Sequence, residues 1–167
     1  MWFADQRLFQ PHWTAEILTE WRRSVLRRFK DLDEGKLLAK QAEMNEFFPD
    51  AEITGYERFT PCVELPDGGD NHVLAAAVVG RCAGIVTCNT KHFPAEVTKP
   101  LGIEVIHPDD FIVNIIDLHP TRAATACKDH RAAMGVSKPT PEQFLERYRQ
   151  AGLIQAHQRL SRHVNLI

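Results

Sequence analysis

Two aspartates enclose a pair of glycines near the middle of the chain. Asp67 and Asp70 flank Gly68-Gly69, and a run of apolar residues begins at Val73. This order predicts that both carboxylates lie at the start of a helix, where the helix dipole stabilises negative charge. Paired carboxylates there could coordinate Mg²⁺ or Mn²⁺, which prefer hard oxygen ligands. Aspartate is also a common capping and turn residue, so the spacing alone leaves both interpretations open.

Two other neighbourhoods carry polar groups that could join such a site. Glu20 lies at the margin of the apolar face of a helix that we predict from Thr14 to about Phe29, so its carboxylate could point across a cleft. The polar run from Thr87 to His92 follows a short apolar stretch typical of a buried parallel strand. Ligands of open α/β sheets bind beyond the carboxyl ends of the strands. A solvated edge charge and ordinary turn chemistry explain the same residues, so both interpretations stay open here too.

Basic side chains provide possible contacts for nucleic acid. Arg22 and Arg23 lie on the first long predicted helix, and Lys91 lies in the polar run. They could contact RNA phosphates, although arginines on a helix often form only a solvated face. The formal net charge of −2 argues against a general nucleic-acid coat but permits a local basic groove. The eight histidines include no HxxxH or HExxH pair, which argues against a zinc hydrolase.

Composition and termini indicate a protein of the cytoplasm. The four cysteines form no CxxC pair, and we expect them to be reduced and mostly buried. The first residues lack the basic and apolar regions of a secretory signal. The longest apolar run, Val73 to Val79, is too short to span a bilayer. We therefore expect cytoplasmic localisation and no membrane contact.

The order of the predicted elements sets the fold class. Helix, strand, short helix and strand follow one another up to residue 106, which is the order of an α/β fold with a parallel sheet. We predict an α/β domain over residues 1–107 and a helical C-terminal extension over residues 108–167. The predicted helices cover residues 14–29, 33–48, 73–79, 111–118, 120–134, 141–153 and 154–167, and the predicted strands cover 51–54, 83–87 and 103–106.

Several segments together resemble the PIN-domain family of ribonucleases. Residues 65–77, LPDGGDNHVLAAA, resemble its third acidic motif, and residues 85–94, IVTCNTKHFP, resemble its fourth. Residues 14–21 are similar to the helix that carries the second acid. Residues 44–56 and the helical tail resemble the subgroup found as toxins of toxin–antitoxin pairs. The resemblance implies a PIN-like parallel sheet flanked by helices, a metal-dependent endoribonuclease activity, and RNA and a cognate antitoxin as partners.

The resemblance also implies roles for individual residues. Asp70 and Glu20 would be the metal-binding acids of the third and second motifs, and Asp67 would be a nearby carboxylate of the same metal site. Asn89 and Thr87 would orient ligands, water or phosphate. The implied cofactor is Mg²⁺ or Mn²⁺, which activates water and stabilises charge on the attacked phosphate. From these roles we predict that the side chains of Asp70, Glu20 and Asn89 converge on one cleft.

Two departures from the family pattern affect this interpretation. The first acid, expected after an N-terminal strand, has no counterpart, and Met1 to Leu8 resemble the end of the helix that would follow that strand. The acid expected before Phe93-Pro94 is replaced by His92. His92 could still bind Mn²⁺ or Zn²⁺, but losing an anionic ligand weakens the attraction for Mg²⁺. We therefore expect a weakly bound metal.

These departures open alternatives and one further expectation. The main alternative is a catalytically inactive PIN-like binding protein that retains antitoxin or RNA contacts. A small phosphate binder built on Gly68-Gly69 is a third interpretation, although neither GxGxxG nor GxxxxGK occurs. A missing first strand would leave strand edges unpaired, and unpaired edges favour pairing with another chain. We therefore predict a homodimer with Met1-Trp2-Phe3 at its interface.

Overall fold

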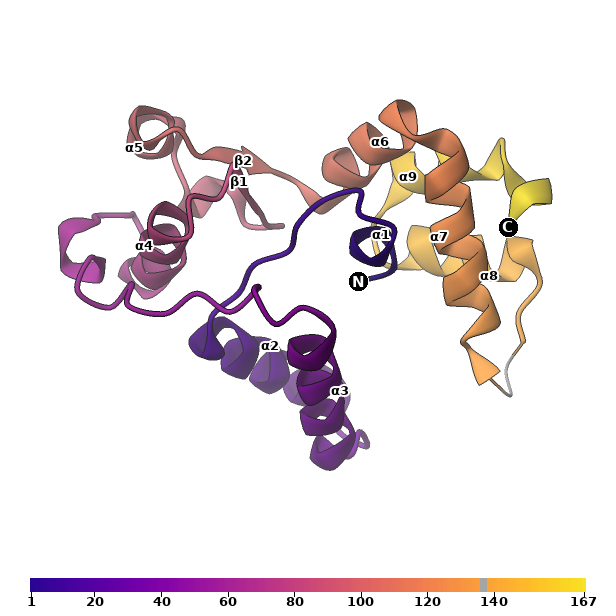
Figure 1. The fold of residues 1–167 in the computed structure, drawn as a ribbon, viewed down its shortest axis with the longest axis horizontal. Coiled ribbons are helices and arrows are strands. Elements are labelled where there is room, and N and C mark those ends of the chain that lie inside the picture. Colours follow the sequence, from indigo (N-terminus) through magenta and orange to yellow (C-terminus); the bar gives the residue numbers. More distant parts are fainter. Residues whose placement is uncertain (136–137) are drawn as a thin grey trace. The chain divides into compact units, whose positions relative to one another are not determined.

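The chain forms two compact units in the computed structural model, which describes residues 1–135 and 138–167 (Figure 1). The central unit comprises Pro11–Ile85 and Lys91–Val105. The helical unit comprises Met1–Gln10, Val86–Thr90 and Ile106–Ile167. The domain boundary at residue 107 stays a prediction.

The central unit begins with two capped helices. Helix α2 (Ala15–Arg28) starts where the Thr14 hydroxyl accepts a hydrogen bond from the backbone N–H of Ile17 at 3.0 Å. Helix α3 (Glu34–Phe47) starts where the carboxylate of Asp33 accepts one from Gly35 at 2.8 Å. Both helices confirm the sequence predictions and follow from the ability of short polar side chains to satisfy free N–H groups.

The apolar face predicted for α2 is only partly buried. Leu18 is 3% exposed, but Trp21 is 36% and Phe29 is 54% exposed. The 100° periodicity correctly identifies a helix but overstates how far this face is covered. Ile17 and Leu18, in the first half of α2, join a buried apolar cluster that includes Trp13 and Ala51.

The strand predicted at residues 51–54 is reduced to a single parallel bridge between Trp13 and Glu52. Trp13 donates to the carbonyl of Ala51 at 3.0 Å, and Ile53 donates to the carbonyl of Trp13 at 2.8 Å. The backbone then turns at Gly55, whose φ of 75° is favourable only for residues such as glycine. The turn prevents the pairing from continuing, so the strand prediction is wrong in extent.

Helix α4 (Asn71–Val79) is the buried helix of the central unit. It follows a 3₁₀ turn, η2 (Gly68–Asp70), and buries His72 and the stretch Leu74–Ala77, as its apolar sequence predicts. Gly80 ends the helix with an ordinary φ of −75°. Its small size serves packing, because a Cβ atom there would lie 2.3 Å from Cδ1 of Ile53.

Strands β1 (Gly84–Val86) and β2 (Glu104–Ile106) form the two-stranded sheet of the described residues. Glu104 donates to Ala83 and Thr87 donates to Ile106, each at 3.0 Å, which is the slanted pattern of parallel strands. The connection contains η3 (Thr90–His92), α5 (Ala95–Thr98) and η4 (Lys99–Leu101). The predicted α/β class with a small parallel sheet is therefore confirmed.

The helical unit packs its helices around one apolar core that includes Phe3, Ile116, Phe144 and Leu160. Its elements are α1 (Trp2–Asp5), α6 (Pro108–Leu118), α7 (Pro120–Ala132), α8 (Pro141–Gln150), α9 (Ile154–Ser161) and η6 (Val164–Leu166). The predicted C-terminal helices are present, although α7, α8 and α9 end earlier than predicted. Thr140 forms a capping box at the start of α8.

The N-terminal residues belong to this core. Phe3 is 8% exposed, and the ring of Trp2 stacks on His130 of α7 with 5.6 Å between ring centroids. Met1-Trp2-Phe3, which we expect from sequence to face a second copy, therefore packs largely against its own chain.

All four cysteines are free, but they are not mostly buried as predicted. Cys127 is buried and Cys82 is half-buried, whereas Cys62 and Cys88 are exposed. The prediction is wrong for the last two, because both lie in polar connecting segments. Among the described residues, no helix has the length and apolar character needed to cross a membrane.

Candidate metal centre

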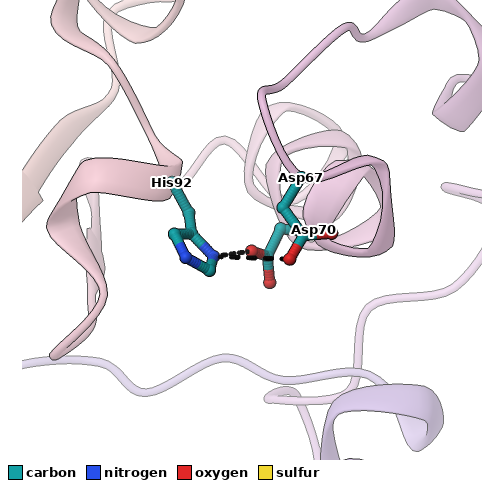
Figure 2. Close-up of side chains that lie close together, drawn as sticks. All are labelled: Asp67, Asp70 and His92. Carbon is teal, nitrogen blue, oxygen red and sulfur yellow. Dashed lines mark hydrogen bonds and ion pairs between the residues drawn. The ribbon is translucent and has the colours of Figure 1, made fainter.

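Three side chains of the central unit converge at the start of α4. Nδ1 of His92 lies 2.6 Å from Oδ2 of Asp70 and 3.7 Å from Oδ2 of Asp67. One potential ligand atom from each residue lies within 4.8 Å of the other two. Figure 2 shows the imidazole of His92 facing both carboxylates. The arrangement unites the third and fourth sequence motifs.

Local structure fixes both aspartates. Oδ1 of Asp67 accepts a hydrogen bond from the N–H of Gly69 at 2.9 Å, which leaves Oδ2 directed at His92. Asp70 is the N-cap residue of α4, yet no capping bond of its side chain is found in the described residues. The side chain of Asn71 closes the loop by accepting from the N–H of Leu65 at 3.1 Å. Asp67 is therefore both a turn residue and a candidate ligand, and the carboxylate of Asp70 faces His92 instead of capping α4.

A buried anchor positions His92. The residue ends η3, and the next residue, Phe93, is 4% exposed in an apolar cluster with Leu74 and Ile85. This anchor keeps the imidazole near the surface. The side chains of His92, Asp70 and Asp67 are 39%, 27% and 56% exposed, so solvent and substrate can reach the cluster.

The donor set fits a divalent cation of intermediate hardness. Mg²⁺ favours oxygen ligands almost exclusively, whereas Mn²⁺ and Zn²⁺ also accept imidazole nitrogen. Two carboxylates and one histidine supply charge and three donors, which leaves coordination positions for water and a phosphate oxygen. The cluster therefore fits Mn²⁺ better than Mg²⁺.

Glu20 lies in a second charged cluster on the central unit. Its Oε2 is 3.3 Å from Nε2 of His72, and Oε2 of Glu16 is 3.5 Å from Nδ1 of the same ring. His72 is 5% exposed, and within the described residues neither ring nitrogen has a well-aligned hydrogen-bond partner. These contacts, although not aligned as hydrogen bonds, connect Glu20 to the helix that begins after Asp70.

The phenol of Tyr56 completes this second cluster. Its hydroxyl donates to Oε2 of Glu16 at 3.0 Å. Burial raises the pKa of Tyr56, and the neighbouring Glu16 raises it further, so the phenol stays protonated and remains a donor. No sequence pattern singled out His72, Glu16 or Tyr56 as a site residue. The four-residue spacing of Glu16 and Glu20, which places both on one face of α2, was the available signal.

The remaining predicted site residues occupy different surroundings. The hydroxyl of Thr87 accepts from the N–H of Asn89 at 3.1 Å, which is ordinary turn chemistry within the helical unit. The predicted convergence of Asn89 with Asp70 and Glu20 stays a prediction, as do the roles of Thr87 and Asn89.

The basic residues differ in their availability. The side chain of Arg22, on α2, is held against α3: its Nε lies 3.2 Å from Oε1 of Glu34, and its Nη1 donates to Oε1 of Gln41 at 3.0 Å. Arg23 and Lys91 are exposed. Arg22 therefore has a structural explanation, and RNA contacts by these three residues stay predictions.

Comparison with known families decides the relationship. The model of the PIN domain matches residues 2–91, which is more than half of the chain. The chain belongs to the PIN-domain family. Within this family it combines the two acidic motifs described above with a C-terminal region, residues 108–162, that matches the VapC50 C-terminal domain.

One curated relative is similar over a shorter segment. A protein of Mycobacterium tuberculosis (strain ATCC 25618 / H37Rv) that is named "Putative ribonuclease VapC50" is 54% identical over 50 residues. The segment is 30% of this chain and 30% of that protein, so less than a third of the relative's length is matched. No solved structure matches the chain.

Proposed function

We propose that this PIN-domain protein is a toxin-type endoribonuclease that hydrolyses RNA phosphodiester bonds with a divalent metal ion held by Asp67, Asp70 and His92. The convergence of these three side chains at the start of α4 carries the proposal. The name of the relative and the match to the VapC50 C-terminal domain support the ribonuclease and toxin assignments.

In this proposal, some residues bind the metal ion, one accepts a proton and one orients the phosphate. A bound Mn²⁺ would supply Lewis acidity and an activated water molecule. Asp67 and Asp70 would hold it through carboxylate oxygens, and His92 through Nδ1 in its neutral form. Glu20 would accept a proton from the attacking water, and Asn89 would orient the phosphate. The negative charge of Asp67 and Asp70 would compensate in part for the negative charge that a histidine in place of an acid does not supply.

Partners and location follow from the same assignment. A cognate antitoxin protein would neutralise the nuclease, and the cytoplasm would be the site of action. We also propose a homodimer, since the described residues contain only a two-stranded sheet with unpaired edges.

One observation favours a second candidate function. His92 occupies the place of an acid, and its Nδ1 already lies 2.6 Å from Asp70. This contact engages Asp70 without a metal. The protein would then be a catalytically inactive PIN-like protein that binds RNA or its antitoxin.

An RNA cleavage assay on the full chain separates the two candidates. We expect Mn²⁺-dependent endonucleolytic cleavage, weaker with Mg²⁺, and a loss of about 100-fold in rate for Asp70→Asn. Asp31→Asn, which removes an exposed carboxylate between α2 and α3, is the matched control and should cleave normally. RNA or antitoxin binding without cleavage under any divalent ion would refute the nuclease and support the binding protein.

A further inference from the structure

A concave pocket lies in the helical unit among the carboxyl ends of α6 and α9 and the start of α7. Its volume is about 220 Å³, and its lining consists of Ile116, Asp117, Pro120, Arg159, Arg162 and His163. This volume is below the ~300 Å³ at which sites for drug-sized ligands begin. The pocket therefore suits one phosphate group with its attached sugar.

The pocket is held in shape by a buried carboxylate at the opposite end of the same two helices. Asp109 of α6 is 5% exposed and accepts from the backbone N–H groups of Gln155 and Ala156 at 2.9 and 2.8 Å. This contact fixes the first turn of α9 against the first turn of α6. Because both helices start at this point, Asp117 and Arg159 come together further along them, with Oδ1 3.2 Å from Nη1.

Arginines provide the charge of the pocket. Arg159 uses Nη1 for Asp117, which leaves further N–H donors on its guanidinium. Within residues 1–135 and 138–167, neither Arg162 nor His163 has a hydrogen-bonding or ionic partner of its side chain. Two guanidinium groups and an imidazole around one small cavity match the oxygens of a phosphate, which arginine binds with paired N–H donors.

The wall also contains groups that match a ribose. Oδ2 of Asp117 has no partner within the described part of the chain, and this carboxylate can accept a hydrogen bond from a sugar hydroxyl. Ile116, which is 2% exposed, and Pro120 provide an apolar floor for the sugar ring. The 2′-hydroxyl is the group by which proteins distinguish RNA from DNA.

The sequence that contains the pocket is also more basic than the rest of the chain. Residues 106–167 contain eight Lys and Arg against six Asp and Glu, whereas residues 1–105 contain twelve against sixteen. The helical region is therefore the basic part of an acidic protein. A polyanion is attracted to it more than to the rest of the chain.

We propose that this pocket binds one ribonucleotide unit of an RNA chain, with the phosphate on Arg162 and Arg159 and the 2′-hydroxyl on Asp117. The proposal rests on RNA being the substrate of the proposed function. It adds a binding site that lies outside the two acidic clusters and needs no metal ion.

Fluorescence anisotropy with a short labelled single-stranded RNA tests the pocket in the full chain, in EDTA so that no cleavage occurs. Arg162→Gln should weaken RNA binding about 5- to 10-fold and reduce the salt slope by about one, as expected for one lost phosphate contact. Lys128→Gln removes the same charge from an exposed position on α7 and is the matched control. It should change the affinity less than twofold.

A DNA oligonucleotide of the same sequence tests the ribose contact. Wild type should prefer RNA over DNA, and Asp117→Ala should remove the preference while raising the affinity for both, because it removes a negative charge. Equal binding of RNA and DNA by wild type would overturn the ribose assignment. Equal loss with Arg162→Gln and Lys128→Gln would overturn the pocket.

Two further arms separate this proposal from its rivals. Inorganic phosphate should compete with RNA only weakly, and phosphate binding that depends on Arg162 while RNA binding does not would show a site for free phosphate instead. Asp31→Asn, which removes an exposed carboxylate outside both the pocket and the metal cluster, should bind RNA as wild type does. If RNA binding depends on Arg162 but the chain never cleaves RNA, the proposed nuclease function would be refuted and the proposed RNA-binding pocket would be supported.

Discussion

His92 distinguishes this site from an all-carboxylate centre. Its imidazole contacts both aspartates and supplies a nitrogen donor where the family pattern has an acid. A nitrogen donor shifts the preference towards Mn²⁺ and away from Mg²⁺, and it also contributes no negative charge. In the proposed metal centre, the identity of this one residue would therefore affect both which metal is preferred and how strongly that metal is held.

Replacing His92 with aspartate should restore magnesium binding. His92→Asp adds a hard anionic donor, so we expect Mg²⁺ affinity to rise about 10-fold or more, with Mg²⁺-supported RNA cleavage rising in parallel. Isothermal titration of the full chain with Mg²⁺ measures the change. Lys91→Asp, which adds an acid at the neighbouring exposed position, is the control and should have a smaller effect. Unchanged Mg²⁺ affinity in His92→Asp would argue that His92 is not a ligand.

The buried thiol of Cys127 should make the stability of the folded protein fall at alkaline pH. Burial raises the pKa of Cys127 from 9.0 to about 11, while a contact with the Tyr148 hydroxyl, 3.7 Å away, lowers it slightly. Above pH 9 the unfolded chain releases this proton before the folded chain does. The stabilisation is therefore complete below pH 9 and is lost as pH rises to about 11, a change of about 2–3 kcal/mol.

Urea unfolding at pH 7.5 and pH 10.5 measures this dependence. Cys127→Ala should be less stable at pH 7.5 but should lose less stability on the way to pH 10.5 than wild type does. Cys62→Ala changes an exposed thiol and should follow the wild-type profile. An identical pH profile for Cys127→Ala and wild type would show that other groups cause the alkaline loss.

At the residue scale, the sequence predicted the helix start at Asp67 and Asp70 but not the contacts of His72, which lies in the helix that follows. The glycine-flanked pair of Asp67 and Asp70 is a local pattern, and it predicts a helix start wherever it occurs. His72 could not be found in this way, because a histidine in an apolar helix gives no sign of which charges face it. Its contacts with Glu16 and Glu20 depend on how α2 packs against α4, which no local pattern specifies.

Side chains that cap helix N-termini fix where several helices begin in each unit. Thr14, Asp33 and Thr140 cap helices from the adjacent sequence, and each was predictable or could be inferred from its position. Asp109 instead caps α9 from 46 residues away. The predicted strand at residues 51–54 was wrong for a similar reason, because pairing needs a neighbour that sequence periodicity does not reveal.

Removing the carboxylate of Asp109 should destabilise the helical unit. Asp109→Ala leaves the first N–H groups of α9 without their buried acceptor, so we expect a loss of about 2–3 kcal/mol in the free energy of unfolding. Asp110→Ala removes an exposed neighbouring carboxylate, which accepts a hydrogen bond from the side chain of Gln155, and it should cost about 0.5 kcal/mol or less. Chemical denaturation of both variants provides the comparison, and equal losses would contradict the capping role.

The whole molecule combines a small parallel sheet with two separate sets of helices. The α/β class was predictable because helices and strands alternate up to residue 106. The division into compact units was not, since residues 1–10 join the C-terminal helices through apolar contacts that link the two ends of the sequence. Contacts of such long separation leave no periodic trace.

The two-stranded sheet makes self-association testable. The unpaired strand edges should be covered by a second copy, so we expect a homodimer at micromolar concentration by light scattering. Because Phe3 is already buried within its own chain, Phe3→Ala should destabilise the fold rather than dissociate the dimer. A monomer across the micromolar range would contradict the proposed homodimer and would leave the metal centre unaffected.

The position of a manganese ion tests the central claim most directly. Crystals of the full chain soaked in Mn²⁺ would reveal the ion by its anomalous scattering. We predict a peak within about 2.5 Å of one oxygen from Asp67, one oxygen from Asp70 and Nδ1 of His92, and no such peak in Asp70→Asn. An ion bound elsewhere, or an undisturbed contact between His92 and Asp70 at saturating Mn²⁺, would contradict the assignment of this cluster as the metal centre.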